Sequence, residues 1–208
     1  MSRRFALPLA VLALAAAPMT VVAQEATKPA PHDAHGEQKP GATHQMTGGM
    51  AEMHAKMHPA GAAAIKPLYD QFKSWIVATA EQVPEADYAF APTTGVRSIG
   101  QLVGHVANAN YMFCSRAVGG ESPSKVDIEK TVTAKAELVA ALKAAFAYCD
   151  AAYAMPDDKL TGDVELFGMK GSQLWVLNFN AVHNAEHYGN LVTYLRMKGM
   201  VPPSSQRM

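Results

Sequence analysis

Apolar side chains recur every three or four residues along four stretches of this chain, which is the period of an amphipathic helix. Proline and glycine residues separate the stretches, and Ser98, with Gln101 three residues later, forms a helix-capping pattern. The predicted helices cover residues 62–83, 98–117, 125–154 and 172–198. The positions predicted to face a core are Leu68, Phe72, Trp75, Ile76, Thr79, Val83, Ile99, Leu102, Val103, Val106, Asn110, Phe113, Ile128, Val132, Val139, Leu142, Phe146, Cys149 and Tyr153. The pattern therefore predicts an all-α domain, a four-helix bundle, over residues 62–205.

Residues 157–171 lack the helical period. Val164, Leu166 and Phe167 predict a short extended piece that lies across the bundle.

The last predicted helix is apolar over much of its circumference, because Trp175, Phe179 and Val182 widen its main apolar face. We expect its neighbours to enclose such a helix. It nevertheless carries a polar stripe that consists of Asn180, His183, His187, Asn190 and Tyr194. A polar group buried without a partner costs about 1–3 kcal/mol, so this stripe must find partners, and a metal ion is one of them.

His183 and His187 are four residues apart, so a helix presents both imidazoles to one place. His105 is the other histidine of residues 62–205, at the edge of the apolar stripe of the second predicted helix. We predict that these three histidines converge on one divalent metal ion. Three neutral imidazoles leave a coordination position open, as in catalytic zinc sites. The alternative is that each histidine is a hydrogen-bonded core side chain.

Glu186 completes the string H-x-x-E-H, which occurs in one class of zinc protease. That class needs a further acidic ligand downstream, and none of the 21 residues after His187 is Asp or Glu. The H-E-x-x-H class is excluded because Asn184 occupies its glutamate position. Glu186, Asn180, Asn190 and Tyr194 remain candidates for orienting a ligand or binding substrate, or for structural hydrogen bonds alone.

Charge excludes two classes of partner. The 18 basic and 18 acidic residues balance, which gives no reason to expect nucleic acid or an anionic membrane as a partner.

The N-terminus predicts export. Residues 2–4 include two arginines, residues 5–17 are an apolar run, and Ala23 ends a small-residue cleavage pattern. We expect residues 1–23 to be a cleaved signal peptide and the mature protein to be periplasmic or secreted, with no membrane association after cleavage. An uncleaved anchor is the alternative.

Residues 24–61 predict a disordered linker, because they contain almost no branched aliphatic side chains. The linker is rich in histidine and methionine, with His32, His35, His44, Met46, Met50, Met53, His54, Met57 and His58. Imidazole and thioether groups together suit copper. The segment is either a weak copper or zinc scavenger or a plain tether.

Cys114 and Cys149 are the only cysteines, and both lie on or beside predicted core stripes. In an oxidising compartment they can form a disulfide; otherwise they are two small buried apolar residues.

Several stretches together resemble the DinB-like (damage-inducible) superfamily of metal-binding four-helix bundles: residues 87–92, 96–105, 110–114, 183–196 and 199–205. The resemblance implies an up-down-down-up bundle, homodimers in many members, and zinc or nickel as the metal. It also implies that His105, His183 and His187 are the metal ligands. The characterised enzymes of the family are transferases and isomerases that use low-molecular-weight thiols.

Two functions follow as hypotheses. The first is an exported metal-dependent transferase or hydrolase that acts on a small molecule at an open three-histidine site. The second is a non-catalytic, stress-related module that buffers copper or zinc. For either one, an ordinary histidine pKa of about 6.5 predicts that metal affinity falls below about pH 6.

Overall fold

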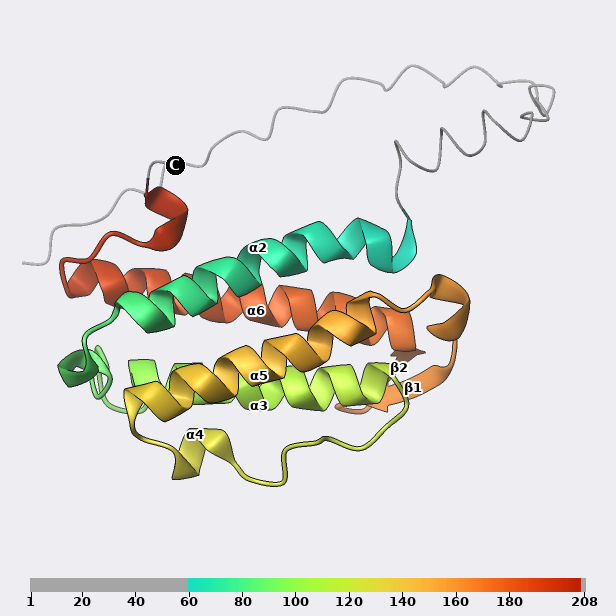
Figure 1. The fold of residues 1–208 in the computed structure, drawn as a ribbon, viewed down its shortest axis with the longest axis horizontal. Helices are drawn as coiled ribbons and strands as arrows, with labels where there is room; N and C mark the ends of the chain where they lie inside the picture. Colours follow the sequence, from blue (N-terminus) through green and yellow to red (C-terminus); the bar gives the residue numbers. More distant parts are fainter. Residues whose placement is uncertain (1–59, 207–208) are drawn as a thin grey trace, which may run out of the picture. The chain divides into compact units, whose positions relative to one another are not determined.

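Four long helices dominate residues 60–206, the part of the chain that the computed structural model describes (Figure 1). They are α2 (Gly61–Gln82), α3 (Ile99–Ala117), α5 (Lys135–Tyr153) and α6 (Gln173–Met197). Helices α2 and α6 run in one direction, and α3 and α5 run in the opposite direction (Figure 1). A short helix α4 (Ile128–Thr131) precedes α5, and strands β1 (Asp163–Leu166) and β2 (Met169–Ser172) precede α6. The prediction of an all-helical domain is confirmed, apart from this one hairpin.

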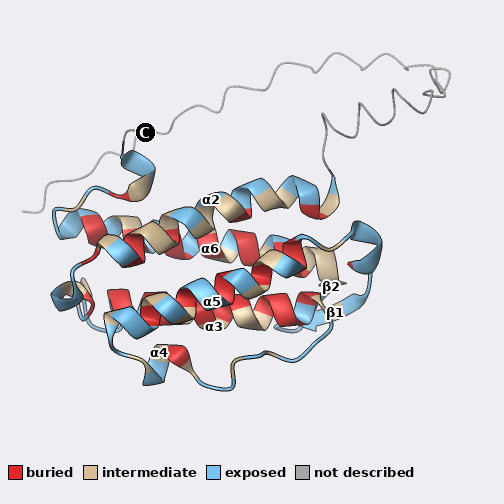
Figure 2. Ribbon diagram, in the orientation of Figure 1, coloured by how far each residue is buried: buried red, intermediate tan, exposed pale blue. Residues whose placement is uncertain are grey.

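The long helices share a single apolar core. Helix α3 packs against α5 and α6, and α2 packs against the same two helices. Buried positions line the inner faces of all four helices (Figure 2). The largest fully buried side chains include Tyr69, Ile76, Ile99, Phe113, Leu138, Leu142, Phe146, Leu177, Leu191 and Leu195.

Side-chain caps fix the start of the two helices that carry the histidines. The Ser98 hydroxyl accepts a hydrogen bond from the Gln101 amide at 3.2 Å, and the Gln101 side chain accepts one from the Ser98 amide at 2.9 Å. The Ser172 hydroxyl likewise accepts a bond from the Trp175 amide at 3.2 Å at the start of α6. These caps satisfy amide groups that the first helical turn leaves unpaired.

The predicted third helix over residues 125–154 is wrong, because the structure divides it into α4 and α5. Residues 131–133 are the β-branched run Thr-Val-Thr, which disfavours helix, and Val132 has extended backbone angles. The break lets α4 lie directly on α3. A Cβ atom at Gly104 would come within 2.7 Å of the Cα atom of Glu129, so only glycine permits this contact.

Two residues predicted to face the core are instead exposed, Leu68 by 60% and Val182 by 62%. Helix α6 packs mainly against α2 and α3, so its remaining side faces solvent rather than a neighbour. The expectation that α6 is enclosed all round is therefore wrong.

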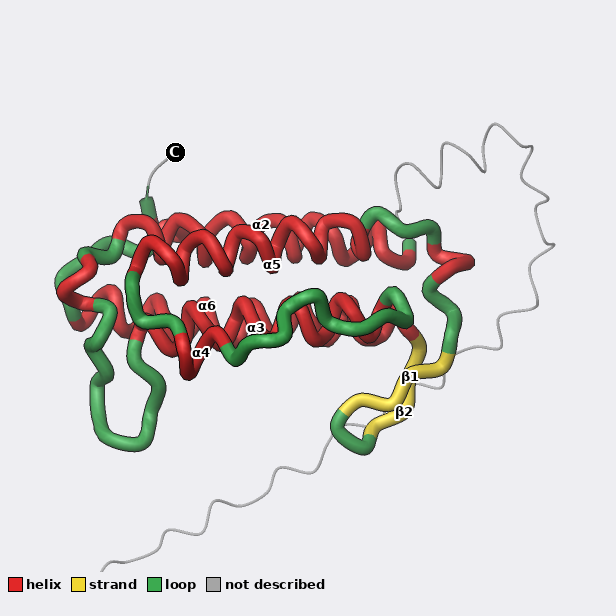
Figure 3. The backbone as a smooth tube through the Cα atoms, turned by 60° about the horizontal axis from the view of Figure 1, so that its bottom comes forward, coloured by secondary structure: helices red, strands yellow, loops and turns green. Residues whose placement is uncertain are grey.

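The predicted extended piece is one strand of an antiparallel hairpin, in which Val164 pairs with Gly171 and Leu166 pairs with Met169. Phe167 does not belong to the strand. It forms the two-residue turn with Gly168, and both have positive φ angles, 52° and 76°. Such turns match the twist of a hairpin, but a bulky residue rarely adopts this conformation. The hairpin projects at the end of the helices where α6 begins (Figure 3).

Cys114 of α3 and Cys149 of α5 form a disulfide, with their Cα atoms 5.3 Å apart. Of the two alternatives that the sequence leaves open, the structure supports the covalent link. It joins two neighbouring helices inside the core across a separation of 35 residues.

The predicted signal peptide and residues 24–59 of the predicted linker lie outside the described residues. Within residues 60–206, no helix combines the length and the apolar character needed to cross a membrane.

Candidate metal centre

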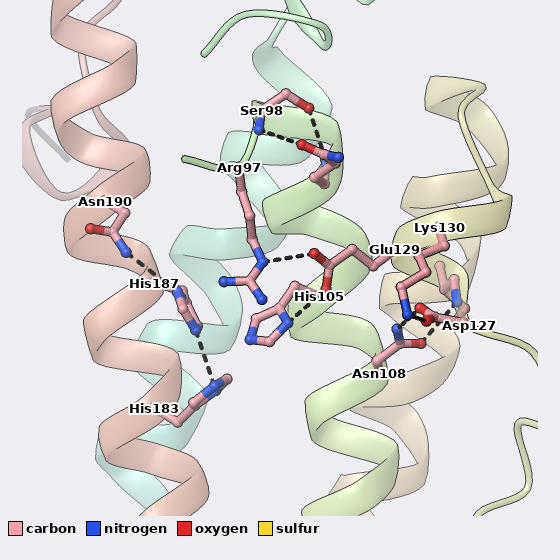
Figure 4. Close-up of polar contacts among 12 residues, drawn as sticks. Arg97, Ser98, His105, Asn108, Asp127, Glu129, Lys130, His183, His187 and Asn190 are labelled. Atoms are coloured by element: carbon pink, nitrogen blue, oxygen red, sulfur yellow. Dashed lines mark hydrogen bonds and ion pairs between the residues drawn. The ribbon is translucent and has the colours of Figure 1, made fainter. Parts of the chain in front are cut away.

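Three histidine side chains from two helices meet in one place. His105 extends from α3, and His183 and His187 extend from α6 on adjacent turns (Figure 4). One potential ligand nitrogen of each lies within 4.8 Å of the others. The Nε2 atoms of His183 and His187 are 3.0 Å apart. The structure thus brings together the three residues that their helical spacing predicted would converge.

A carboxylate from α4 holds the first of these imidazoles. The Nδ1 atom of His105 lies 2.9 Å from Oε2 of Glu129. A carboxylate accepts only, so Nδ1 carries the proton and Nε2 keeps its lone pair for a metal ion. Carboxylates bound in this way commonly fix the orientation and raise the basicity of metal-ligating histidines.

Arg97 completes the arrangement, because its Nε atom lies 2.8 Å from the other oxygen of Glu129. Partial burial raises the pKa of Glu129, but hydrogen bonds from Arg97 and His105 outweigh that effect and leave the pKa below its usual value. Glu129 is therefore a carboxylate at neutral pH.

The two histidines of α6 lie in surroundings that disfavour a charged imidazole. Burial, followed by the neighbouring His187, His105 and Arg97, lowers the pKa of His183 to about 3. The Nδ1 atom of His183 is buried without a hydrogen-bond partner, so nothing stabilises a proton there. Burial and then His105 lower the pKa of His187 to about 4. Both side chains are neutral at pH 7, as a metal ligand must be.

The aromatic ring of Phe113 lies behind His183. Its centroid is 5.1 Å from that of the imidazole, and Phe113 is itself almost fully buried. Phe167, at the tip of the hairpin, packs on the other side of Phe113 with a centroid distance of 6.2 Å. The tip of the hairpin thus contacts the aromatic ring that packs against His183.

The other predicted site residues divide into two groups. Asn190 and Tyr194 lie at the site: both line its pocket, and the side-chain amide nitrogen of Asn190 is 3.4 Å from Nδ1 of His187. Glu186 is exposed and forms no hydrogen bond or ion pair with any described residue, so the orienting role considered for it belongs to Glu129.

Asn180 lies in a separate buried amide network. Its side-chain nitrogen contacts the Asn110 side-chain oxygen at 3.1 Å and the Tyr153 hydroxyl at 3.3 Å. Asn184 joins the same network through Asn110. These amides hold α3, α5 and α6 together near the disulfide, and the role of Asn180 is structural.

Sequence reasoning missed Glu129 and Arg97. Glu129 lay inside a predicted continuous helix, and Arg97 lay in a predicted loop. Gly104 was the available signal, because a glycine inside an amphipathic helix one position before a candidate ligand indicates that another backbone comes close there.

A pocket of about 530 Å³ opens next to His187. Most of its lining is polar: Gly95, Val96, Arg97, Gln101, Leu102, Glu129, His187, Asn190 and Tyr194. The candidate centre is therefore reachable from solvent on one side.

The donor set fits a zinc-like divalent ion. Ligands at bond lengths of about 2.0–2.1 Å lie about 3.3 Å apart in a tetrahedral site. The His183–His187 pair is already near that spacing, and the candidate ligand atoms of all three histidines lie within 4.8 Å of one another.

Comparison with known proteins supports a family relationship. The family model described as the DinB superfamily matches residues 68–191. The crystal structure of a DinB-like protein, YjoA of Bacillus subtilis, is similar with a TM-score of 0.53 and 22% sequence identity, over 68% of this chain and 99% of that one. No curated protein matches the chain.

Proposed function

Because the chain belongs to the DinB superfamily, we propose that it is an exported protein that binds one divalent metal ion and uses it to transform a small molecule. The ligands are His105, His183 and His187, and zinc or nickel is the proposed ion. The four long helices are proposed to be the family's up-down-down-up bundle, which their observed directions support.

The observation that carries this proposal is the His105–Glu129 contact of 2.9 Å beside the close His183–His187 pair. A histidine in the core for hydrogen bonding alone does not require two further imidazoles to face it. In many metal sites a carboxylate binds one nitrogen of a histidine side chain, and the other nitrogen of that imidazole binds the metal.

Each residue of the centre has a proposed task. An ion held by three neutral imidazoles acts as a Lewis acid on a sulfur or oxygen atom that it binds. Glu129 holds the His105 ring in the ligating tautomer. Phe113 excludes water behind His183, whereas Asn190 and Tyr194 lie at the open side, where a substrate enters.

Export rests on the basic and apolar N-terminus and gains support from the disulfide. Disulfides persist in oxidising compartments and are rare in reducing ones. The Cys114–Cys149 bond is therefore in keeping with a periplasmic or secreted protein. Export also takes the chain away from the cytosolic thiols that characterised members of the family use.

The open pocket favours catalysis over the alternative function, metal buffering. A buffering centre has no need of an accessible face, whereas the pocket here reaches His187 and is lined by groups that can bind or orient a substrate. The histidine and methionine residues of segment 24–61 are the part of the chain that suits buffering, and all of them lie outside the described residues.

The experiment is metal analysis of full-length protein purified from the export compartment. We expect about one divalent ion per chain and an oxidised cysteine pair, and loss of the ion in His105→Ala but not in Arg116→Gln, an exposed position at the end of α3. A panel of thiol-transfer and hydrolysis reactions then tests activity. Protein that holds no ion, even after incubation with zinc or nickel, would contradict the proposal.

A further inference from the structure

Arg97 places positive charge at the mouth of the candidate metal centre. Its guanidinium points into the space between His187 on one side and His105 and Glu129 on the other (Figure 4). The group therefore lies close to where a metal-bound molecule would sit.

The guanidinium has unused hydrogen-bonding capacity. Its Nε atom binds Oε1 of Glu129 at 2.8 Å, and the other oxygen of Glu129 binds His105. Within residues 60–206, neither terminal nitrogen of Arg97 makes a hydrogen bond. The two terminal N–H groups are parallel and form the fork that binds both oxygens of one carboxylate.

The charge balance of the mouth also favours an anion. Arg97 and Glu129 are the only charged residues that line the pocket, and they cancel one another. Imidazole binds a metal ion only in its neutral form, so a divalent ion held by the three histidines would leave the centre with a net charge of about +2. A substrate that brings negative charge would be attracted and would not leave Arg97 unpaired.

We propose that the substrate is a small organic acid whose carboxylate binds the terminal nitrogens of Arg97 while a nearby sulfur or oxygen atom binds the metal. This inference rests on the proposed function and adds the chemical class of the substrate. Arg97 is then a substrate-binding residue as well as the partner of Glu129.

The test compares two thiols that differ only in charge, 3-mercaptopropionate and 3-mercaptopropionamide. Each is titrated into full-length protein loaded with Co²⁺, and binding is followed by the sulfur-to-cobalt absorption band. The absorption measured with His183→Ala is subtracted, because it reports cobalt bound elsewhere on the chain. Arg116→Gln, an exposed arginine at the end of α3, is the matched control for Arg97→Gln.

In Arg97→Gln the affinity for 3-mercaptopropionate should fall about tenfold or more, because a charge-assisted hydrogen-bonded pair is lost. The same variant should change affinity for the neutral amide much less, since the amide has no carboxylate to pair with Arg97, and Arg116→Gln should change neither affinity. Equal effects on both thiols, or no effect on either, would overturn the inference and leave the metal centre intact. Absence of a His183-dependent cobalt signal would contradict the proposed function, and the inference with it.

Discussion

Replacing His183 with alanine is expected to abolish the stabilisation that a divalent metal gives to this protein. A ligand that binds only the folded state at 100 times its dissociation constant stabilises it by about 2.7 kcal/mol. Without His183 the remaining imidazoles come from different helices and no longer form a close pair. The metal-free variant should change less than this, because it loses the 3.0 Å contact between the His183 and His187 Nε2 atoms and some packing against Phe113, but no metal ion.

Urea unfolding at pH 7.5, with zinc and with chelator, measures this difference directly. His58→Ala is the control, because it removes a histidine from the segment outside the described residues and should retain the full effect of the metal. If His183→Ala keeps the full stabilisation by zinc, as His58→Ala should, the stabilising ion is bound elsewhere.

The metal-free protein is expected to lose stability as the pH falls from 6.5 to 5. In the unfolded chain His183 and His187 take up protons near pH 6.5, whereas in the folded protein their pKa values are about 3 and about 4. The unfolded state therefore binds more protons over this range, and the free energy of unfolding decreases as pH decreases. Each histidine should contribute about 1.6 kcal/mol between pH 6.5 and pH 5, because an unfolded histidine is half protonated at pH 6.5 and the slope reaches about 1.4 kcal/mol per pH unit only at lower pH.

The range from pH 6.5 to pH 5 distinguishes the effect of the histidines on the free energy of unfolding from that of the carboxylates. Glu129 also has a lowered pKa, but its contribution is lost only below its unfolded value of about 4.3. The measurement is urea unfolding with chelator at several pH values, in the wild type and in His183→Gln, which cannot titrate. The free energy of unfolding should fall with decreasing pH about half as steeply in the variant as in the wild type. Equal slopes in the two proteins would show that His183 is not a neutral buried group.

The same pKa values alter the expectation for metal binding. From an ordinary histidine pKa, metal affinity should fall below about pH 6. In the folded protein, protons compete with the metal at His183 and His187 only when the pH approaches about 4. Acid is thus expected to reduce the stability of the fold before it displaces the ion from these two ligands.

Local sequence pattern was sufficient for most of the fold and for the three histidines that meet in one place. The period of apolar residues located α2, α3 and α6, and the Ser98–Gln101 pair located the start of α3. His183 and His187 were predictable because four residues make about one helical turn, whatever surrounds the helix.

Features that depend on contacts between distant segments were not predictable in this way. The carboxylate that binds His105 comes from Glu129, which is 24 residues away in the sequence. Glu129 lies on α4, and predicting α4 as a helix separate from α5 would have required us to recognise that the Thr-Val-Thr run ends it. Val182 was misplaced because apolarity does not show which side of a helix lacks a neighbour. Two cysteines on core stripes left the disulfide undecided, since pairing depends on how α3 and α5 meet.

The binding of one ion between α3 and α6 is tested most directly by anomalous diffraction at the zinc absorption edge from crystals of zinc-loaded protein. We expect one strong peak within about 2.0–2.2 Å of a nitrogen atom of each of His105, His183 and His187. A crystal that shows no peak between these three side chains, or whose only peak lies elsewhere on the chain, would contradict it.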